Sequence, residues 1–210
     1  MYILDLIGTF AFAVTGALKA KTHDLHLFGA IFLGTITAVG GGTVRDLIIG
    51  RTPLFYLTDH NYLIIAIAAS ILTYFIPTVF KKWYSFFRFI DSIGLSAFAI
   101  IGVSVAYKHL FNSNGFTLIS FLASALMGML TGFGGGIIRD VVMGSIPFAF
   151  RKGSNYALAA LCGSVSFYLI MFLNSTAAII FSILLTLVCR EIISPFGVYK
   201  KVFRKKIKKK

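Results

Sequence analysis

Two short segments of the chain combine three glycines with an arginine and an aspartate. Residues 40–46 read GGGTVRD and residues 134–140 read GGGIIRD. Each segment lies inside a long apolar run, and a charged side chain at the centre of a bilayer costs about 3 kcal/mol or more. Three adjacent glycines also weaken a helix by roughly 1 kcal/mol each relative to alanine. Two such costly segments in matching places indicate the functional part of the molecule.

Three consecutive glycines within a membrane span have two structural uses. They let another helix approach closely, because no side chains hold the two helices apart. They also break a helix, and the freed carbonyl groups are tolerated at membrane depth only inside protein or beside a water-filled cavity. A break offers a dehydrated cation both carbonyl oxygens and the negative end of a half-helix dipole. The adjacent charges favour the break, so we predict an ion path past each triplet. The glycines concerned are Gly40, Gly41, Gly42, Gly134, Gly135 and Gly136.

The charges of each motif need partners on other helices, because neighbouring side chains on one helix do not face each other. Asp5 and Asp91 lie near the ends of two other apolar runs. We predict the contacts Arg45–Asp5 and Arg139–Asp91, or the same pairs exchanged between the two copies. Such pairs either clamp helices together or act on ions, with carboxylates drawing cations into two mouths and arginines limiting or gating the bore. The residues predicted as pore or gating charges are Asp5, Arg45, Asp46, Asp91, Arg139 and Asp140.

The residue patterns do not support other chemistry. Neither glycine motif has the Gly-Lys-Ser/Thr ending of a phosphate loop or the Gly-x-Gly-x-x-Gly pattern of a dinucleotide site. No Ser, His and Asp set has a plausible common location. His23 and His26 lack the further ligands that a metal site needs. We therefore predict no catalytic residue, no metal site, no cofactor and no nucleic-acid partner, and we expect the chain not to be an enzyme.

The composition places these motifs in a membrane. The chain has 210 residues, of which 58% are hydrophobic and 13% are charged, whereas soluble domains carry about 25% charged residues. A helix needs about 20 mainly apolar residues to cross a bilayer. By that measure the sequence predicts an all-α membrane protein with seven transmembrane helices in one domain, residues 1–194. The predicted spans are residues 2–20, 26–49, 61–80, 92–107, 116–143, 155–173 and 176–193.

The first three spans repeat as the next three. Residues 5–16 and 91–102 share Asp, Ile, Gly, Ala, Phe, Ala and Gly in the same order and spacing, and a glycine and a proline follow both motifs at equal distances. Each unit, residues 2–80 and residues 91–173, holds an odd number of spans, so the second unit must be inverted relative to the first. Inverted repeats are typical of transporters, with the pathway between the repeats near the midplane. The last span, residues 176–193, has no counterpart and is predicted to be an accessory helix.

Basic residues are concentrated on one side of the predicted membrane. The side that holds the first loop carries many of them, whereas the opposite side carries only Arg51 and Lys108. Because lysine and arginine favour the cytoplasmic side, we expect the N-terminus outside and the C-terminus in the cytoplasm. The basic tail, residues 195–210, is expected to bind anionic lipid. The basic residues on the cytoplasmic side before the tail are Lys19, Lys21, Lys81, Lys82, Arg88, Arg151, Lys152 and Arg190.

With seven spans, an inverted repeat and two Gly-Gly-Gly-x-x-Arg-Asp motifs, the chain resembles the prokaryotic relatives of the trimeric intracellular cation (TRIC) channels. The resemblance extends over residues 5–193 and includes bacterial proteins with a glycine-transporter domain. It implies a homotrimer in the plasma membrane, a pore in each protomer, kinks at the two glycine triplets and potassium as the main permeant ion. Animal members carry other basic residues near their glycines and bind phosphoinositide there. This chain has Arg45 and Arg139 instead, so the resemblance allows a bound lipid but does not carry over that phosphoinositide site or voltage gating.

Three functions are compatible with these patterns. The one we predict is a passive channel for monovalent cations, K⁺ or Na⁺, lined by the first, second, fourth and fifth spans. The alternative is a secondary transporter of a small amino acid such as glycine, whose carboxylate the N-termini of half-helices would hold. The third is a scaffold in which the charged pairs only lock the helices together.

Overall fold

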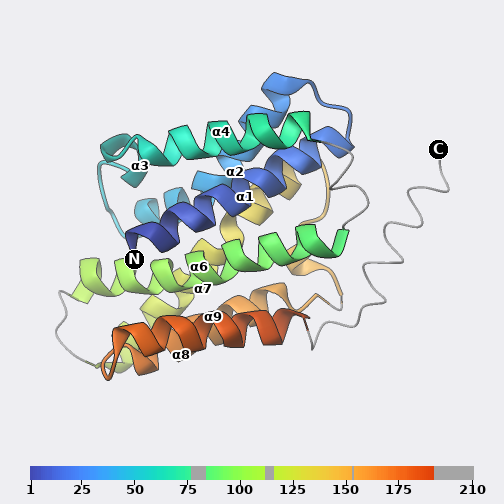
Figure 1. The fold of residues 1–210 in the computed structure, drawn as a ribbon. Helices are drawn as coiled ribbons and strands as arrows, with labels where there is room; N and C mark the ends of the chain where they lie inside the picture. The colour runs from blue at the N-terminus through green and yellow to red at the C-terminus, as the bar shows by residue number, and fades with distance from the viewer. Residues whose placement is uncertain (77–83, 112–115, 153, 192–210) are drawn as a thin grey trace.

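The computed structural model describes residues 1–76, 84–111, 116–152 and 154–191, and these residues form helices and no strand (Figure 1). Within these described ranges, seven helices have 15 residues or more, and α3 and η1 are short helices that follow α2 and α7. In chain order the helices are α1 (Tyr2–Thr22), α2 (Leu27–Ile48), α3 (Phe55–Thr58), α4 (Asn61–Phe75), α6 (Tyr84–Phe111), α7 (Leu118–Val142), η1 (Phe148–Phe150), α8 (Tyr156–Ile170) and α9 (Ser175–Glu191).

The chain is an integral membrane protein. Four described helices are long and apolar enough to cross a bilayer, namely Tyr2–Thr22, Leu27–Ile48, Arg88–Phe111 and Leu118–Val142. The apolar helices α4 and α8 have 15 residues each, which gives a length of about 22 Å against a hydrocarbon core of about 30 Å. Because these two helices are shorter than the hydrocarbon core, the crossing of the membrane by all seven helices stays a prediction.

The third and fourth predicted spans differ most from the helices at their ends. The predicted fourth span begins at residue 92, whereas α6 already begins at Tyr84. The helix includes Arg88 because an ion pair compensates this charge: Arg88 Nη2 lies 2.8 Å from Oε2 of Glu191 on α9. The predicted third span extends to residue 80, whereas α4 ends at Phe75, and residues 77–83 lie outside the described part of the chain.

The helices pack as two groups of three with α9 added to the second (Figure 1). In the first group α1, α2 and α4 contact one another, and in the second α6, α7 and α8 do so. The two groups meet where α1 contacts α6 and where α2 contacts α7. The last helix, α9, packs on α6 and α8. The four helices α1, α2, α6 and α7 therefore form the centre of the molecule.

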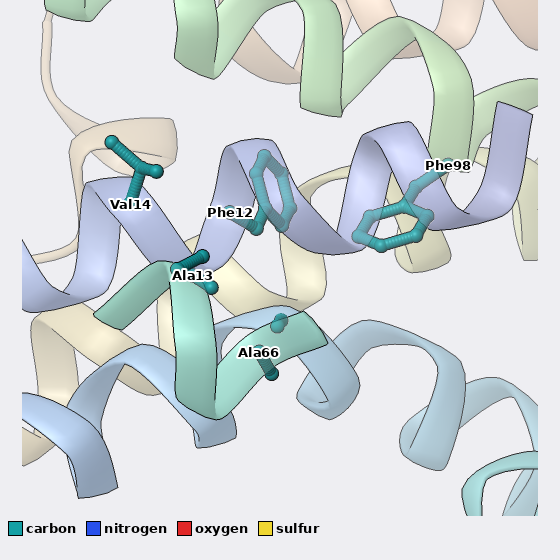
Figure 2. Packing of buried hydrophobic residues seen from close by; sticks show 7 residues of the cluster. Phe12, Ala13, Val14, Ala66 and Phe98 are labelled. Carbon is teal, nitrogen blue, oxygen red and sulfur yellow. The ribbon is translucent and has the colours of Figure 1, made fainter. Parts of the chain in front are cut away.

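Equivalent residues face each other where α1 crosses α6. The rings of Phe12 and Phe98 lie edge to face with centroids 5.1 Å apart (Figure 2). A Cβ atom on Gly94 would lie closer than 3.0 Å to the ring of Phe12, and one on Gly8 would lie 3.0 Å from the ring of Phe98. Each phenylalanine thus occupies the space that a glycine of the other helix leaves open, as a two-fold relation between the two groups would produce.

The helices that carry the two motifs end in the same way. A positive φ follows each helix, 70° at Gly50 and 62° at Gly144, and glycine adopts this conformation without a steric penalty. The backbone N–H of Arg51 then donates to the carbonyl oxygen of Asp46 at 2.8 Å, and that of Ser145 donates to the carbonyl oxygen of Asp140 at 2.9 Å. These are the bonds of a Schellman turn, and they hold the charged end of each motif against the loop that follows.

Candidate functional site

The two glycine triplets meet where α2 crosses α7. A Cβ atom on Gly41 would lie closer than 3.0 Å to the carbonyl oxygen of Thr131, and one on Gly135 would lie closer than 3.0 Å to that of Thr37. The contacts are reciprocal, because each threonine stands four residues before the glycine of its own helix. Only Cα hydrogens separate the two backbones here, as small residues allow in membranes and as Cα–H···O contacts favour. We call this contact the glycine crossing.

The predicted helix breaks are wrong, because both triplets lie within unbroken helices. The structure is helical without interruption from Leu27 to Ile48 and from Leu118 to Val142. Close approach, the other use of glycine, is what the structure shows. The low helix propensity of the triplets is offset by the contact between the two helices, and propensity is a weak rule wherever such packing is available.

A first group of polar side chains, the Asp46 cluster, lies at the end of α2. The Nη2 atom of Arg45 lies 2.7 Å from Oδ1 of Asp46, and both residues are buried. Arg51 is half-exposed, and its Nη1 atom lies 3.7 Å from the same oxygen. Asp5 of α1 accepts a hydrogen bond of 2.9 Å from the hydroxyl of Tyr62 on α4. The members of the Asp46 cluster are Asp5, Arg45, Asp46, Arg51 and Tyr62.

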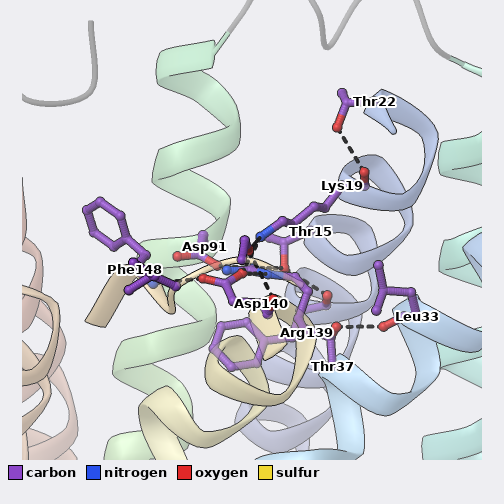
Figure 3. Close-up of polar contacts among 12 residues, drawn as sticks. Thr15, Lys19, Thr22, Leu33, Thr37, Asp91, Arg139, Asp140 and Phe148 are labelled. Carbon is purple, nitrogen blue, oxygen red and sulfur yellow. Dashed lines mark hydrogen bonds and ion pairs between the residues drawn. The ribbon is translucent and has the colours of Figure 1, made fainter. Parts of the chain in front are cut away.

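A second group, the Asp140 cluster, lies at the end of α7 (Figure 3). Lys19 extends from the last turn of α1, and its Nζ atom lies 2.6 Å from Oδ1 of Asp140. Arg139 lies between two carboxylates, with Nε 3.0 Å from Oδ1 of Asp140 and Nη1 3.2 Å from Oδ1 of Asp91. The guanidinium of Arg190 on α9 pairs with the other oxygen of Asp91. The members of the Asp140 cluster are Lys19, Asp91, Arg139, Asp140 and Arg190.

The two clusters share one local arrangement around the motif aspartates. The Oδ2 atom of Asp46 accepts a hydrogen bond of 3.3 Å from the backbone N–H of Phe55. The Oδ2 atom of Asp140 accepts one of 2.8 Å from the backbone N–H of Phe148. Phe55 and Phe148 are the first residues of α3 and η1. Each aspartate therefore ties the end of a long helix to the short helix that follows it.

One of the two predicted interhelical pairs is confirmed. Arg139 and Asp91 form an ion pair, whereas no ion pair among the described residues joins Arg45 to Asp5, whose carboxylate is bonded to Tyr62 instead. The premise that adjacent residues cannot pair was also wrong, because both arginines contact the aspartate that follows them. Neighbouring Cβ atoms on a helix do point in different directions. The arginine side chain is nevertheless long enough to fold back along the helix and reach the next residue.

Four members of the clusters were not predicted as site residues. The sequence pattern assigns Lys19, Arg51 and Arg190 only to the two sides of the membrane, and it does not single out Tyr62. A signal for two of them was available, because Lys19 and Arg190 are charged residues inside apolar runs, the same feature that selected the motifs. A neutral tyrosine in an apolar run carries no comparable signal.

Helix α1 connects the two clusters. Asp5, near its start, belongs to the Asp46 cluster, and Lys19, 14 residues later, belongs to the Asp140 cluster. At 1.5 Å per residue their Cα atoms are about 21 Å apart along the helix. Charged groups therefore occupy both ends of the four central helices, with the glycine crossing and the phenylalanine pair between them. Within the described residues, no group of three or more His, Cys, Asp or Glu is placed to hold a metal ion.

Comparison with known proteins gives consistent relatives. A family model described as "Glycine transporter" matches residues 2–78 and 88–172. The UPF0126 inner membrane protein YadS of Escherichia coli K12 is 39% identical over 168 residues, which are 79% of this chain and 76% of that protein. A UPF0126 membrane protein of Vibrio cholerae is 36% identical over 194 residues, which are 90% of this chain and 77% of that protein.

Solved structures agree with these relatives. The TRIC channel orthologue from Rhodobacter sphaeroides superposes with a TM-score of 0.82 at 30% identity, covering 93% of this chain and 97% of that one. The chain belongs to the prokaryotic TRIC family. A prokaryotic TRIC channel solved in 0.5 M KCl superposes on this family member with a TM-score of 0.77 at 31% identity, covering 92% and 96% of the two chains. The all-helical fold described above is thus the TRIC fold.

Proposed function

We propose that this TRIC family member is a passive channel for monovalent cations, with potassium as the main permeant ion. The observation that carries the proposal is the similarity to TRIC cation channels over at least 90% of the chain, with TM-scores of 0.77 to 0.82. The seven long helices would cross the membrane as an inverted three-plus-three repeat with α9 as the additional helix. The ion path would follow α1, α2, α6 and α7 within each protomer.

The two clusters support this path because they place carboxylates at both of its ends. The carboxylates of Asp5 and Asp46 belong to one end, and those of Asp91 and Asp140 belong to the other. Rings or groups of acidic side chains favour cations at the mouths of pores. Each carboxylate also has a partner that fixes its position, so the same contacts serve helix packing.

The middle of the path is tightly packed in the conformation described. The glycine crossing brings α2 and α7 into backbone contact, and the rings of Phe12 and Phe98 meet between α1 and α6. We infer that this conformation is the closed one, and that ions pass when the two groups of helices move relative to each other at these two contacts. The glycines permit such sliding because they present no side chains that interlock.

The proposal extends to assembly and location. We propose a homotrimer in the plasma membrane, since TRIC channels are trimeric by name and the relative in Escherichia coli is an inner membrane protein. The N-terminus would lie outside and the C-terminus in the cytoplasm, where the basic tail would bind anionic lipid. The relatives described as channels also support the absence of enzymatic activity.

A glycine carrier is the less favoured alternative, although the matching family model has the description "Glycine transporter". That mechanism was based on half-helices whose N-termini hold a carboxylate. Both motif helices are continuous, so the N–H groups at the triplets are not free to bind one.

The test is ion flux through purified protein in liposomes. We expect potassium flux that follows its gradient without saturation at millimolar concentrations, and no accumulation of labelled glycine. If folded and assembled protein passes no cation, the proposed channel function is wrong. If the protein instead takes up glycine in a saturable way, the glycine carrier becomes the better explanation.

A further inference from the structure

The two clusters differ in charge although the motifs that build them repeat. The Asp46 cluster holds two arginines and two aspartates, and both arginines lie near Asp46 while Asp5 is bonded to Tyr62. The Asp140 cluster holds three cations and two aspartates. The ion pair between Arg88 and Glu191 lies beside the second cluster and adds no net charge. At the first end Asp59 adds a carboxylate, whose pKa the Tyr2 hydroxyl lowers by hydrogen bonding, so that the group stays ionised. The Asp140 end is therefore the more positive of the two.

The additional positive charge comes from residues outside the repeated pattern. In the register that aligns Asp5 with Asp91, the position of Lys19 corresponds to Val105 in the second unit. Arg190 lies on α9, which has no counterpart in the first unit. Both cations nevertheless contact carboxylates of the repeat directly. The Asp140 end thus receives one cation from the other group of helices and one from the additional helix.

Differences in exposure increase the contrast between the ends. The side chain of Arg51 is 36% exposed and lies 3.7 Å from its aspartate, whereas the side chain of Lys19 is 19% exposed and lies 2.6 Å from its own. Arg190 is 4% exposed. Water screens a buried charge less than an exposed one, so the cations of the Asp140 end act more strongly on a nearby ion.

We propose that Lys19 and Arg190 make the ion path rectify, so that cations pass more readily from the Asp46 end to the Asp140 end than in the reverse direction. The inference rests on the proposed channel. Current entering at a mouth rises with the local concentration of permeant ions, and fixed charge at that mouth sets this concentration. The mouths are about 21 Å apart along α1, or about two Debye lengths at 0.1 M salt, so each acts on its own side.

The experiment is single-channel recording in planar bilayers with the same KCl solution on both sides. The measured quantity is the rectification ratio, the cation current from the Asp46 end to the Asp140 end divided by the current in the reverse direction at equal and opposite voltages. We compare wild type with Lys19→Gln, Arg190→Gln and Arg51→Gln, and we use Lys19→Arg and Arg190→Lys as variants that keep the charge. Because Arg190 is buried, Lys19→Gln, at a partly exposed site, keeps the test open if Arg190→Gln fails to assemble.

We expect wild type to rectify at about 0.1 M KCl and to approach a ratio of one at about 1 M, where the Debye length falls to roughly 3 Å. Lys19→Gln should lower the ratio by about 1.5-fold to 2-fold, the effect of one charge some 5–10 Å from the ion in water. Arg51→Gln should raise it, because that substitution makes the other mouth more negative. The variants that keep the charge should resemble wild type.

Opposite signs for Lys19→Gln and Arg51→Gln would support the inference, since a general loss of structure would not produce them. A conducting wild type with equal currents, or ratios that the charge variants leave unchanged, would overturn the inference and leave the channel standing. A wild type that conducts no cation would overturn both.

Discussion

One added methyl group tests whether the glycine triplets serve close approach. In Gly41→Ala and Gly135→Ala the new Cβ would lie closer than 3.0 Å to a carbonyl oxygen of the opposite helix. A backbone carbonyl cannot rotate away as a side chain can, so α2 and α7 would have to separate by about 1 Å to regain an ordinary contact distance. Overpacking of this kind costs about 1–3 kcal/mol.

The sign of the effect distinguishes the two uses of glycine. Replacing glycine by alanine within a helix stabilises it by roughly 1 kcal/mol when nothing obstructs the methyl group. If the triplets were only weak points in their helices, Gly41→Ala would raise the stability. With the helices in contact, the overpacking cost less the gain in helix propensity leaves a net loss of up to about 2 kcal/mol, which lowers the melting temperature by up to roughly 8 °C for a chain of this size.

The assay is thermal unfolding of the purified protein in detergent, followed by loss of the assembled peak in size-exclusion chromatography. Gly40→Ala is the matched control from the same triplet, because its Cβ would meet chiefly Cδ1 of Ile138 at 2.7 Å, the end of a flexible side chain. We expect this variant to melt near wild type or above it. If the Gly41→Ala and Gly135→Ala variants both have melting temperatures equal to or above that of the Gly40→Ala control, the close contact at the glycine crossing is refuted.

Three further substitutions test the clusters. Asp140→Asn leaves the buried guanidinium of Arg139 without its adjacent carboxylate and should cost about 3–5 kcal/mol, seen as a lower melting temperature; an unchanged temperature would contradict the buried pair. Tyr62→Phe removes the hydrogen bond to Asp5 and should cost about 1–3 kcal/mol in the same assay, whereas a neutral effect would indicate that water replaces the hydroxyl. Glu191→Gln removes the charge that joins α9 to α6, and protease digestion should then release the C-terminal part faster than in wild type; equal rates would show that apolar packing alone holds α9.

The sequence allowed a good prediction of which residues matter and a poorer one of how they act. Charge inside an apolar run is unfavourable unless compensated, so Arg45, Asp46, Arg139 and Asp140 stood out, and all four are buried in the structure. Composition also predicted a helical membrane protein. The pairing of Arg139 with Asp91 followed from comparing equivalent positions in the two units.

Other contacts depend on distances that a repeat does not specify. Lys19 meets Asp140 across 121 positions of the chain, and the repeat offered no equivalent pair as a guide. Arg190 lies on the helix without a counterpart, so its contact with Asp91 has no symmetric precedent either. Glycine itself is ambiguous, because the absence of a side chain weakens a helix and also permits contact between helices. Only the position of the neighbouring helix decides between these effects.

We propose that this TRIC family member conducts cations passively between the two charged ends. The most direct measurement is the reversal potential of single-channel current across a bilayer with a KCl gradient. We predict discrete current steps that reverse near the equilibrium potential of potassium and do not change when glycine is added to one side. Reversal near the equilibrium potential of chloride, or the absence of any current from correctly assembled protein, would contradict the claim.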